Sequence, residues 1–325
     1  MRAVVMHETG GPEVLRLEEV PVPVPAGGEV LVRIEAVGLH YAETRARAGA
    51  FPAGDLPRTV GIEGVGTVAD VGDGVHDGLV GTRVLVILVE GMGTWAEYVT
   101  APVTATVPVP DGLAAVAAVG TGLSAGVALA LVRAGRVAGG ESVLVEAAGG
   151  AIGGYLVQFA RAAGAGRIVA TAGSQAKREQ ARKLGADVVV DHRESDWRTR
   201  VPGGLDVVFE SIGGTDAVPL LDALTPGTGR MVFYGLLSGE ALAVTPMDLL
   251  VRGVTLVGFG GRPSTGLARV ARELPEVLAA VARGRLLPLV DQVLPLSQAA
   301  QAHRRMEQRE AVGKLVLATG GDARH

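Results

Sequence analysis

The first hundred residues alternate between short apolar runs and turns. Residues 29–39 (EVLVRIEAVGL) alternate apolar and polar positions, and similar runs follow at residues 61–72, 82–88 and 94–99 with glycine or proline between them. A period of two is typical of strands with one buried face. Several short strands without intervening helices predict a compact, barrel-like β domain at the start of the chain.

The pattern changes after residue 110. Residues 111–135 are rich in alanine and leucine and predict a helix with one glycine-containing break. Buried apolar strands then alternate with helices, which predicts a parallel sheet covered on both faces and an α/β fold class. Helices are expected at residues 154–163, 174–184, 215–224, 267–283 and 297–309, and late strands at residues 254–261 and 314–318.

Length and composition narrow the class of protein. A chain of 325 residues exceeds what one core usually organises, so two domains are expected. Hydrophobic residues make up 48% and charged residues 20%, with a formal net charge of −4. This composition is typical of a soluble enzyme and argues against nucleic acid or an anionic membrane as a partner.

Cysteine is absent, which excludes disulfides and thiolate–metal sites. The N-terminal sequence reaches His7 and Glu8 too early for a signal peptide, and every long apolar segment contains glycines, charges or helix breaks. A cytoplasmic protein is therefore expected.

Residues 148–153 (AGGAIG) form a G-x-G-x-x-G element whose first glycine is replaced by Ala148. Such a turn lets the backbone approach a pyrophosphate while the following helix offers free N–H groups. A tight strand–helix junction without a ligand is the simpler alternative. An expected strand before the turn, a helix after it and a second strand ending near Thr171 favour dinucleotide binding.

The second strand indicates which dinucleotide is bound. An NAD site usually carries an acid about 20 residues after the turn, but no acid occurs from Gly154 to Arg178. Gly173 and Ser174 instead open a helix with Lys177 in its first turn, and Ser174 is a preferred N-cap. A hydroxyl, a helix N-terminus and an ammonium suit a 2′-phosphate, which favours NADPH over NADH. Lys177 as a solvated helix lysine is the alternative.

Several stretches together resemble one family. AVVMHETGGPEVLRLEEVPVPVPAGGEVLVRIEAVGL, GIEGVGTV, the glycine turn, KLGADVVVD, ESIGG and GKLVL are similar, in this order, to the zinc-independent (zeta-crystallin-like) quinone oxidoreductases of the medium-chain dehydrogenase/reductase superfamily. The resemblance implies a GroES-like catalytic domain from residues 1–118 and 262–325. It also implies an NADPH-binding Rossmann domain from residues 119–261, an active site in the cleft and a homodimer joined through TLVGF.

The resemblance also implies which residues hold the cofactor. Gly149, Gly150, Ala151 and Ile152 would hold the pyrophosphate, and Gly173, Ser174 and Lys177 the 2′-phosphate. Family members often have an aromatic hydroxyl near residue 192, where this chain has DHR, so His192 or Arg193 would substitute. A histidine there would make NADPH affinity depend on pH. The remaining implied contacts are Thr121 near the cofactor and Ile212, Gly235 and Phe259 at its nicotinamide end.

A metal ion is not expected. Where zinc-dependent relatives have a cysteine and a histidine, this chain has His40 and Ile62, although Glu63 remains. His40 and Glu63 fall short of the three protein ligands of a catalytic zinc. Without a Lewis acid, a quinone or enone is the favoured acceptor, because conjugation spreads the negative charge that hydride brings.

By the resemblance, GLHYAETRARAG lies at the mouth of the cleft, so His40, Tyr41 and Glu43 are the catalytic candidates. His40 could donate to a carbonyl oxygen and Tyr41 could supply a proton. Glu43 could orient His40 or, more simply, cap a local helix. His303 is expected on an exposed amphipathic helix.

The leading hypothesis is an NADPH-dependent, zinc-free reductase of a quinone or other conjugated carbonyl. A 2-enoyl thioester reductase of fatty acid or polyketide metabolism is the second enzymatic reading. A non-catalytic, crystallin-like NADPH-binding protein is the alternative from another class.

Overall fold

The computed structural model describes residues 1–51, 54–88, 93–260 and 268–320. The chain forms two compact units. The terminal unit consists of Met1–Leu123 and Leu274–His325, and the central unit of Ser124–Glu273. The domain boundary expected at residues 261 and 262 lies outside the described residues. The two units divide within the helices α2 (Ala115–Ala134) and α6 (Ala268–Ala282).

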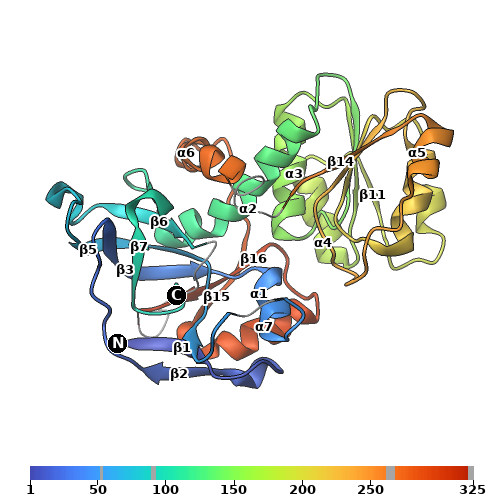
Figure 1. The fold of residues 1–325 in the computed structure, drawn as a ribbon. Coiled ribbons are helices and arrows are strands. Elements are labelled where there is room, and N and C mark those ends of the chain that lie inside the picture. Colours follow the sequence, from blue (N-terminus) through green and yellow to red (C-terminus); the bar gives the residue numbers. More distant parts are fainter. Residues whose placement is uncertain (52–53, 89–92, 261–267, 321–325) are drawn as a thin grey trace. The chain divides into compact units, whose positions relative to one another are not determined.

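The terminal unit is built on a mixed sheet that joins the two ends of the chain. Within the described residues, seven strands form this sheet, with the order β15-β16-β3-β5-β6-β8 and β7 paired to β3. β16 from the end of the chain lies beside β3 (Figure 1). The two strands pair antiparallel, with Leu317 opposite Val37. A second, three-stranded sheet has the order β2-β1-β4.

Apolar side chains of β3 and β16 form much of the core of this unit. In β3, Val30, Val32 and Ile34 are buried beside Leu315 and Leu317 of β16, with Trp95 among them. The strands are β1 (Arg2–Met6), β2 (Leu15–Glu19), β3 (Glu29–Gly38), β4 (Arg58–Thr59), β5 (Glu63–Val71), β6 (Arg83–Ile87), β7 (Tyr98–Pro102), β8 (Thr106–Pro108), β15 (Val290–Pro295) and β16 (Lys314–Ala318). Its own helices are α1 (Tyr41–Arg47) and α7 (Ala299–Glu307), and short 3-10 turns lie at Pro12–Val14, Asp77–Leu79, Val103–Ala105 and Leu296–Gln298.

The central unit contains the parallel sheet expected from the alternation of strands and helices. Within the described residues, its six strands are parallel and follow the order β11-β10-β9-β12-β13-β14. The order reverses between β9 and β12, the kind of switch point at which doubly wound sheets bind ligands. The strands are β9 (Ser142–Val145), β10 (Arg167–Thr171), β11 (Val188–Val190), β12 (Val207–Glu210), β13 (Arg230–Phe233) and β14 (Thr255–Gly258). The helices are α3 (Ala151–Ala162), α4 (Gln175–Lys183) and α5 (Pro246–Arg252), and a 3-10 turn lies at Trp197–Arg200.

The glycine-containing break expected in the alanine-rich helix is present in α2. Gly122 adopts φ −3° and ψ −110°, which are not helical angles. Within the described residues, α2 alone is long and apolar enough to cross a membrane, but 78% of its apolar window is buried inside the protein. Burial of this kind is typical of a core helix.

Two predicted elements differ from the structure. The strand expected at residues 94–99 is reduced to an isolated bridge between Ala96 and Ala3, and β7 begins only at Tyr98. The helix expected at residues 215–224 is a 3-10 segment, Gly214–Ala223. Pro219 lies inside this segment.

Candidate functional site

The glycine turn after β9 lies at the carboxyl edge of the parallel sheet, and its backbone carries few large side chains. Gly150 is the N-cap of α3 and has no side-chain cap, so the first N–H groups of the helix have no side-chain partner there. A Cβ at Gly153 would lie 2.4 Å from the Ala147 carbonyl oxygen, and one at Gly149 would lie 2.4 Å from Lys177 Cβ. Gly149, Gly150, Ala151 and Ile152 therefore form a close-fitting backbone cradle that suits a pyrophosphate.

The start of α4 lies beside this cradle. Ser174 caps α4 by accepting the Lys177 backbone N–H at 3.3 Å, which confirms the predicted cap. The Lys177 side chain packs over Gly149, and a Cβ at Gly173 would lie 2.8 Å from His192 Nε2. The structure therefore brings Gly149, Gly173, Lys177 and His192 together.

Asp191 forms ion pairs with two arginines close to His192. It forms ion pairs with Arg178 and with Arg193, the latter at 2.9 Å. Hydrogen bonds from Arg193, with Arg178 beside it, hold the pKa of Asp191 below its usual value. Because Asp191 is neutralised by two arginines, the surroundings of Gly173 remain suited to a phosphate.

The residues expected at the nicotinamide end follow strands of the same sheet. Ile212 follows β12, Gly235 follows β13 and Phe259 follows β14. A Cβ at Gly235 would lie 2.8 Å from the Ser211 carbonyl oxygen, so a larger residue would displace the backbone there. Thr121 belongs to the terminal unit, where its hydroxyl donates to the Ala117 carbonyl at 2.8 Å.

Two buried carboxyl groups meet at the switch point of the sheet. Phe209 of β12 pairs with Val145 of β9, and Glu210 and Glu146 are the next residues of each strand. Glu210 is 0% and Glu146 3% exposed. Burial, the adjacent Glu210 charge and a hydrogen bond between the two carboxyls raise the pKa of Glu146 well above its usual value. The two groups are therefore expected to share a proton.

In the terminal unit, His40, Glu63 and Lys314 converge from three elements. Glu63 Oε2 lies 2.5 Å from Lys314 Nζ and 2.7 Å from His40 Nε2, and Nζ lies 2.9 Å from Nε2. Burial raises the pKa of Glu63, but the Lys314 ammonium and His40 outweigh this effect and lower it to about 2. Burial and the Lys314 charge lower the pKa of His40.

Two glycines, Gly38 and Gly122, leave room for the cluster of His40, Glu63 and Lys314. A Cβ at Gly38 would lie 2.6 Å from both Glu63 Oε2 and Lys314 Cε, and one at Gly122 would lie 2.2 Å from Glu63 Oε1. The break in α2 also turns the Leu123 N–H toward Glu63 Oε1, at 2.5 Å. Gly38 and Gly122 thus enclose a buried ion pair that a larger residue at either position would disturb.

The Glu43 side chain is buried, and its carboxyl contacts backbone N–H groups. Its carboxyl accepts the His40 N–H at 2.7 Å and the Ile62 N–H at 3.0 Å, and burial raises its pKa to about 8. It therefore ties the segment carrying His40 to the segment carrying Glu63. Tyr41, the first residue of α1, remains partly exposed.

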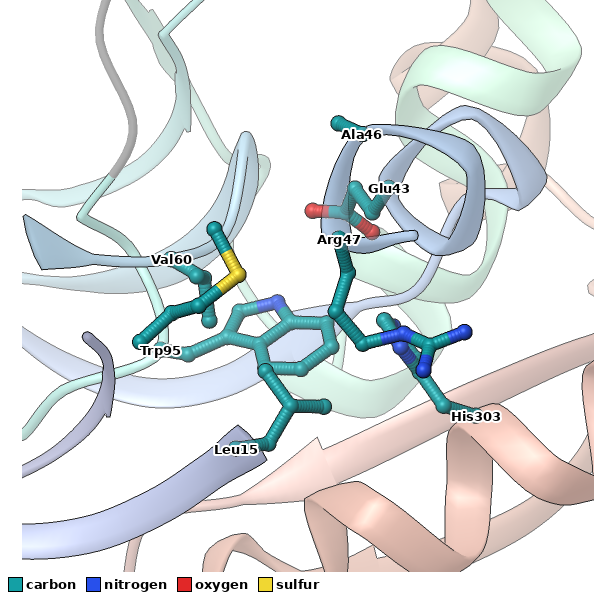
Figure 2. Close-up of a pocket in the computed structure, with 8 residues that line it drawn as sticks. Leu15, Glu43, Ala46, Arg47, Val60, Trp95 and His303 are labelled. Carbon is teal, nitrogen blue, oxygen red and sulfur yellow. The ribbon is translucent and has the colours of Figure 1, made fainter. Parts of the chain in front are cut away.

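His303 corrects one expectation from the sequence. It is 1% exposed instead of solvated, because the inner face of α7 packs against the core. It lines a cavity of about 10 Å³ with Glu43, Arg47 and Trp95 (Figure 2). Its ring meets Trp95 edge-on with centroids 5.1 Å apart. His303 is thus a core residue of the terminal unit.

Lys314 is the site residue that the sequence did not indicate. It stands 251 positions from Glu63 and 274 from His40, so no local spacing reveals the contact. The part of the chain that the structure describes contains no group of three or more His, Cys, Asp or Glu side chains that could hold a metal ion.

Known proteins resemble both units. The family described as "Alcohol dehydrogenase GroES-like domain" matches residues 26–111, and the family described as "Zinc-binding dehydrogenase" matches residues 184–317. The quinone oxidoreductase of Rattus norvegicus is 31% identical over 329 residues, which cover 98% of this chain and 97% of the rat protein. The 2-haloacrylate reductase of a Burkholderia species is 34% identical over 332 residues, which cover 97% and 98% of the two chains.

The fold is also similar to solved structures. The quinone oxidoreductase of Escherichia coli complexed with NADPH matches with a TM-score of 0.89 and 27% identity. The match covers 98% of this chain and 100% of that chain.

Proposed function

Because the chain belongs to the quinone oxidoreductase family of medium-chain dehydrogenases and reductases, we propose that it is an NADPH-dependent reductase of quinones or related conjugated carbonyls. Its fold combines a GroES-like domain with a Rossmann-like parallel sheet. One observation carries the cofactor assignment: Lys177 and His192 lie over the glycines of two neighbouring turns, Gly149 and Gly173.

These residues fit NADPH better than NADH. The cradle at Gly149, Gly150, Ala151 and Ile152 is proposed to hold the pyrophosphate on the N-terminus of α3. Gly173, Ser174, Lys177 and His192 are proposed to hold the 2′-phosphate, for which a cation is favourable and an acid is not. Thr121, Ile212, Gly235 and Phe259 are the further proposed cofactor contacts.

NADPH supplies a hydride when bound. An enone would accept this hydride at its β-carbon. The electron pair of the double bond moves toward the carbonyl oxygen, and a proton then completes the two-electron reduction. His40 and Tyr41, at the start of α1, are proposed to contact the oxygen where charge develops. Glu43 is proposed to position His40 through its backbone N–H.

We also propose that the reaction needs no zinc. The Lys314 ammonium lies within 3 Å of both His40 Nε2 and Glu63 Oε2, the two groups that would otherwise be metal ligands. A bound divalent cation would have to displace this charge. The donor set on the protein therefore supports a conjugated acceptor, which does not require a Lewis acid.

Two features of the central unit support a homodimer. β14 is the last strand in the order of the central sheet, and α5 exposes Met247, Leu250 and Val251. An open strand edge and an exposed apolar patch are features of association surfaces. A chain without cysteine needs no oxidising compartment, which is consistent with a cytoplasmic location.

Steady-state assays test the proposal with 1,4-benzoquinone, 2-chloroacrylate and crotonyl-CoA, each with NADPH and with NADH. We expect NADPH to be oxidised with the quinone or the chloroacrylate. Turnover of the thioester alone would instead favour a 2-enoyl thioester reductase. Tight NADPH binding without oxidation by any acceptor would favour the non-catalytic alternative.

A matched pair of variants tests the cofactor site. Lys177→Ala is expected to raise the KM for NADPH by about tenfold or more and leave that for NADH unchanged, because a charge-assisted contact contributes about 1.5–3 kcal/mol. Lys183→Ala, near the other end of α4, is the control and should change neither. An unchanged preference for NADPH in Lys177→Ala would contradict the assignment.

A further inference from the structure

The cluster of His40, Glu63 and Lys314 has one member that reaches solvent. The side chains of Glu63 and Lys314 are 0% exposed, whereas that of His40 is 12% exposed. Lys314 Nζ, Glu63 Oε2 and His40 Nε2 form a triangle with sides of 2.5, 2.7 and 2.9 Å. His40 therefore lies on the solvent side of the buried ion pair between Glu63 and Lys314.

Lys314 and Glu63 depend on each other. A carboxylate and an ammonium that are both withdrawn from water are tolerated when they are paired and hydrogen-bonded. Glu63 meets this condition fully, since Oε2 is within reach of Lys314 Nζ and Oε1 accepts the Leu123 N–H. The positive charge of this region is thus already present on Lys314.

A protonated His40 would add a second cation at 2.9 Å from the Lys314 ammonium. One carboxylate, Glu63, would then face two positive charges. Glu43, the nearest acid on α1, does not restore the balance, because burial raises its pKa to about 8 and it is largely uncharged at neutral pH. The other group that reaches Glu63 from α2 is the uncharged Leu123 N–H.

We propose that Lys314 is a positioning residue that occupies the cation position beside Glu63 and keeps the His40 ring uncharged while it contacts the acceptor. This inference rests on the proposed function for the identity of the acceptor. Its chemical consequence is that His40 does not act as a titrating acid in the reduction. The proton that completes the reduction is then drawn from water.

NMR titration of the wild-type protein provides the first test. The protein has six histidines, and the His40 resonance is assigned from its absence in His40→Asn. We expect the ring signal of His40 to stay at its neutral position across the pH range in which an ordinary histidine titrates, and kcat/KM for the quinone, measured at saturating NADPH, to be flat over this range. A His40 signal that titrates near its ordinary pKa of about 6.5 would overturn the proposal, without reference to turnover.

Variants at position 314 provide the second test. Lys314→Met removes the charge and keeps an unbranched stem, so the Glu63 carboxylate should now favour a protonated His40. We expect its signal to titrate above pH 6.5 and kcat/KM to acquire a pH-dependent limb at that value. Lys314→Arg keeps the charge and should retain the flat profile.

Lys183→Met, an exposed lysine on α4, is the control. A folded Lys314→Met variant whose His40 signal and pH profile match the wild type would contradict the role of Lys314. If Lys314→Met does not fold, the wild-type titration decides. If the NMR result is as expected but no acceptor is reduced, the proposed function fails and the charge assignment of His40 stands.

Discussion

His303 shows how burial can shift the pKa of a side chain. It lies in the core of the terminal unit, and neither ring nitrogen has a hydrogen-bond partner within the described residues. Burial, with the nearby Arg47 charge as a smaller cause, lowers the pKa of His303 to about 3. The folded protein therefore excludes a proton that the unfolded chain takes up below about pH 6.5.

We predict that this difference destabilises the protein in acid. The free energy of unfolding should fall by about 1 kcal/mol for each pH unit between pH 6 and 4 because of His303 alone. His303→Phe keeps the edge-on contact with Trp95 but cannot titrate, so its stability should fall less steeply. Urea unfolding at several pH values measures the slope, and the exposed His7→Phe serves as the control. Equal slopes for His303→Phe and the wild type would refute the prediction.

Contacts between residues that are close in the sequence could be predicted, whereas contacts between residues that are far apart in the sequence could not. Ser174 and Lys177 share one turn of α4, so a cap and a cation at its start follow from the sequence pattern. Glu63 and Lys314 meet only because β16 returns beside β3. Glu43 was named as a catalytic candidate or, more simply, a helix cap, and its bond to the N–H of His40, the N-cap of α1, is that capping contact. Only the fold reveals its second bond, to the Ile62 N–H.

At the scale of elements, the parallel pairing of β9 and β12 forces two acids together. Glu146 and Glu210 follow the paired residues Val145 and Phe209, so the register itself creates the contact. Glu210 also accepts the N–H groups of Ile212 and Gly213, each at 2.8 Å. Burial raises the pKa of Glu210 as well, so both acids hold protons to a higher pH in the folded state than in the unfolded chain.

This pair should make the protein less stable as pH rises. Stability is greatest below the unfolded pKa of about 4.5 and is lost as pH rises through the raised folded values. Glu146→Gln mimics the protonated acid, so the loss of stability between pH 5 and 8 should be smaller in this variant than in the wild type. Thermal unfolding at both pH values measures this, with the exposed Glu179→Gln as the control. A larger loss in Glu146→Gln than in the wild type would show that the carboxylate is needed.

The spacing of apolar residues predicted the type of most helices and strands. The differences lie at residues 94–99 and 215–224. β3 and the strand–helix alternation of the central unit both follow from buried apolar positions. The helical pattern at residues 215–224 forms a 3-10 segment, and the backbone of Trp95 bonds to Val4 and Val60 outside a regular strand. Local pattern did not specify the 3-10 geometry, and it could not specify the Trp95 contacts because their partners lie far away in the sequence.

At the scale of the whole molecule, the order of the central sheet leaves β14 at an end. Among the residues that the structure describes, its neighbour in the sheet is β13 alone, and the exposed fractions of Met247, Leu250 and Val251 on nearby α5 are 61%, 73% and 74%. Monomeric proteins rarely combine an open edge with such a patch, because the edge can pair with another chain. A second copy of this chain, adding its own β14 and α5, would satisfy both features.

We therefore predict that Leu250→Glu shifts the protein from dimer to monomer. A carboxylate in the apolar patch would have to be buried without a partner, which costs several kcal/mol and weakens a symmetric interface twice. Light scattering after size-exclusion chromatography measures the mass, and Val24→Glu, at a position that is 84% exposed in the terminal unit, is the control. A wild-type mass of 33.1 kDa, that of one chain, would refute the dimer. A dimer that persists in Leu250→Glu would show that the interface lies elsewhere, because α5 cannot carry a buried charge at its centre.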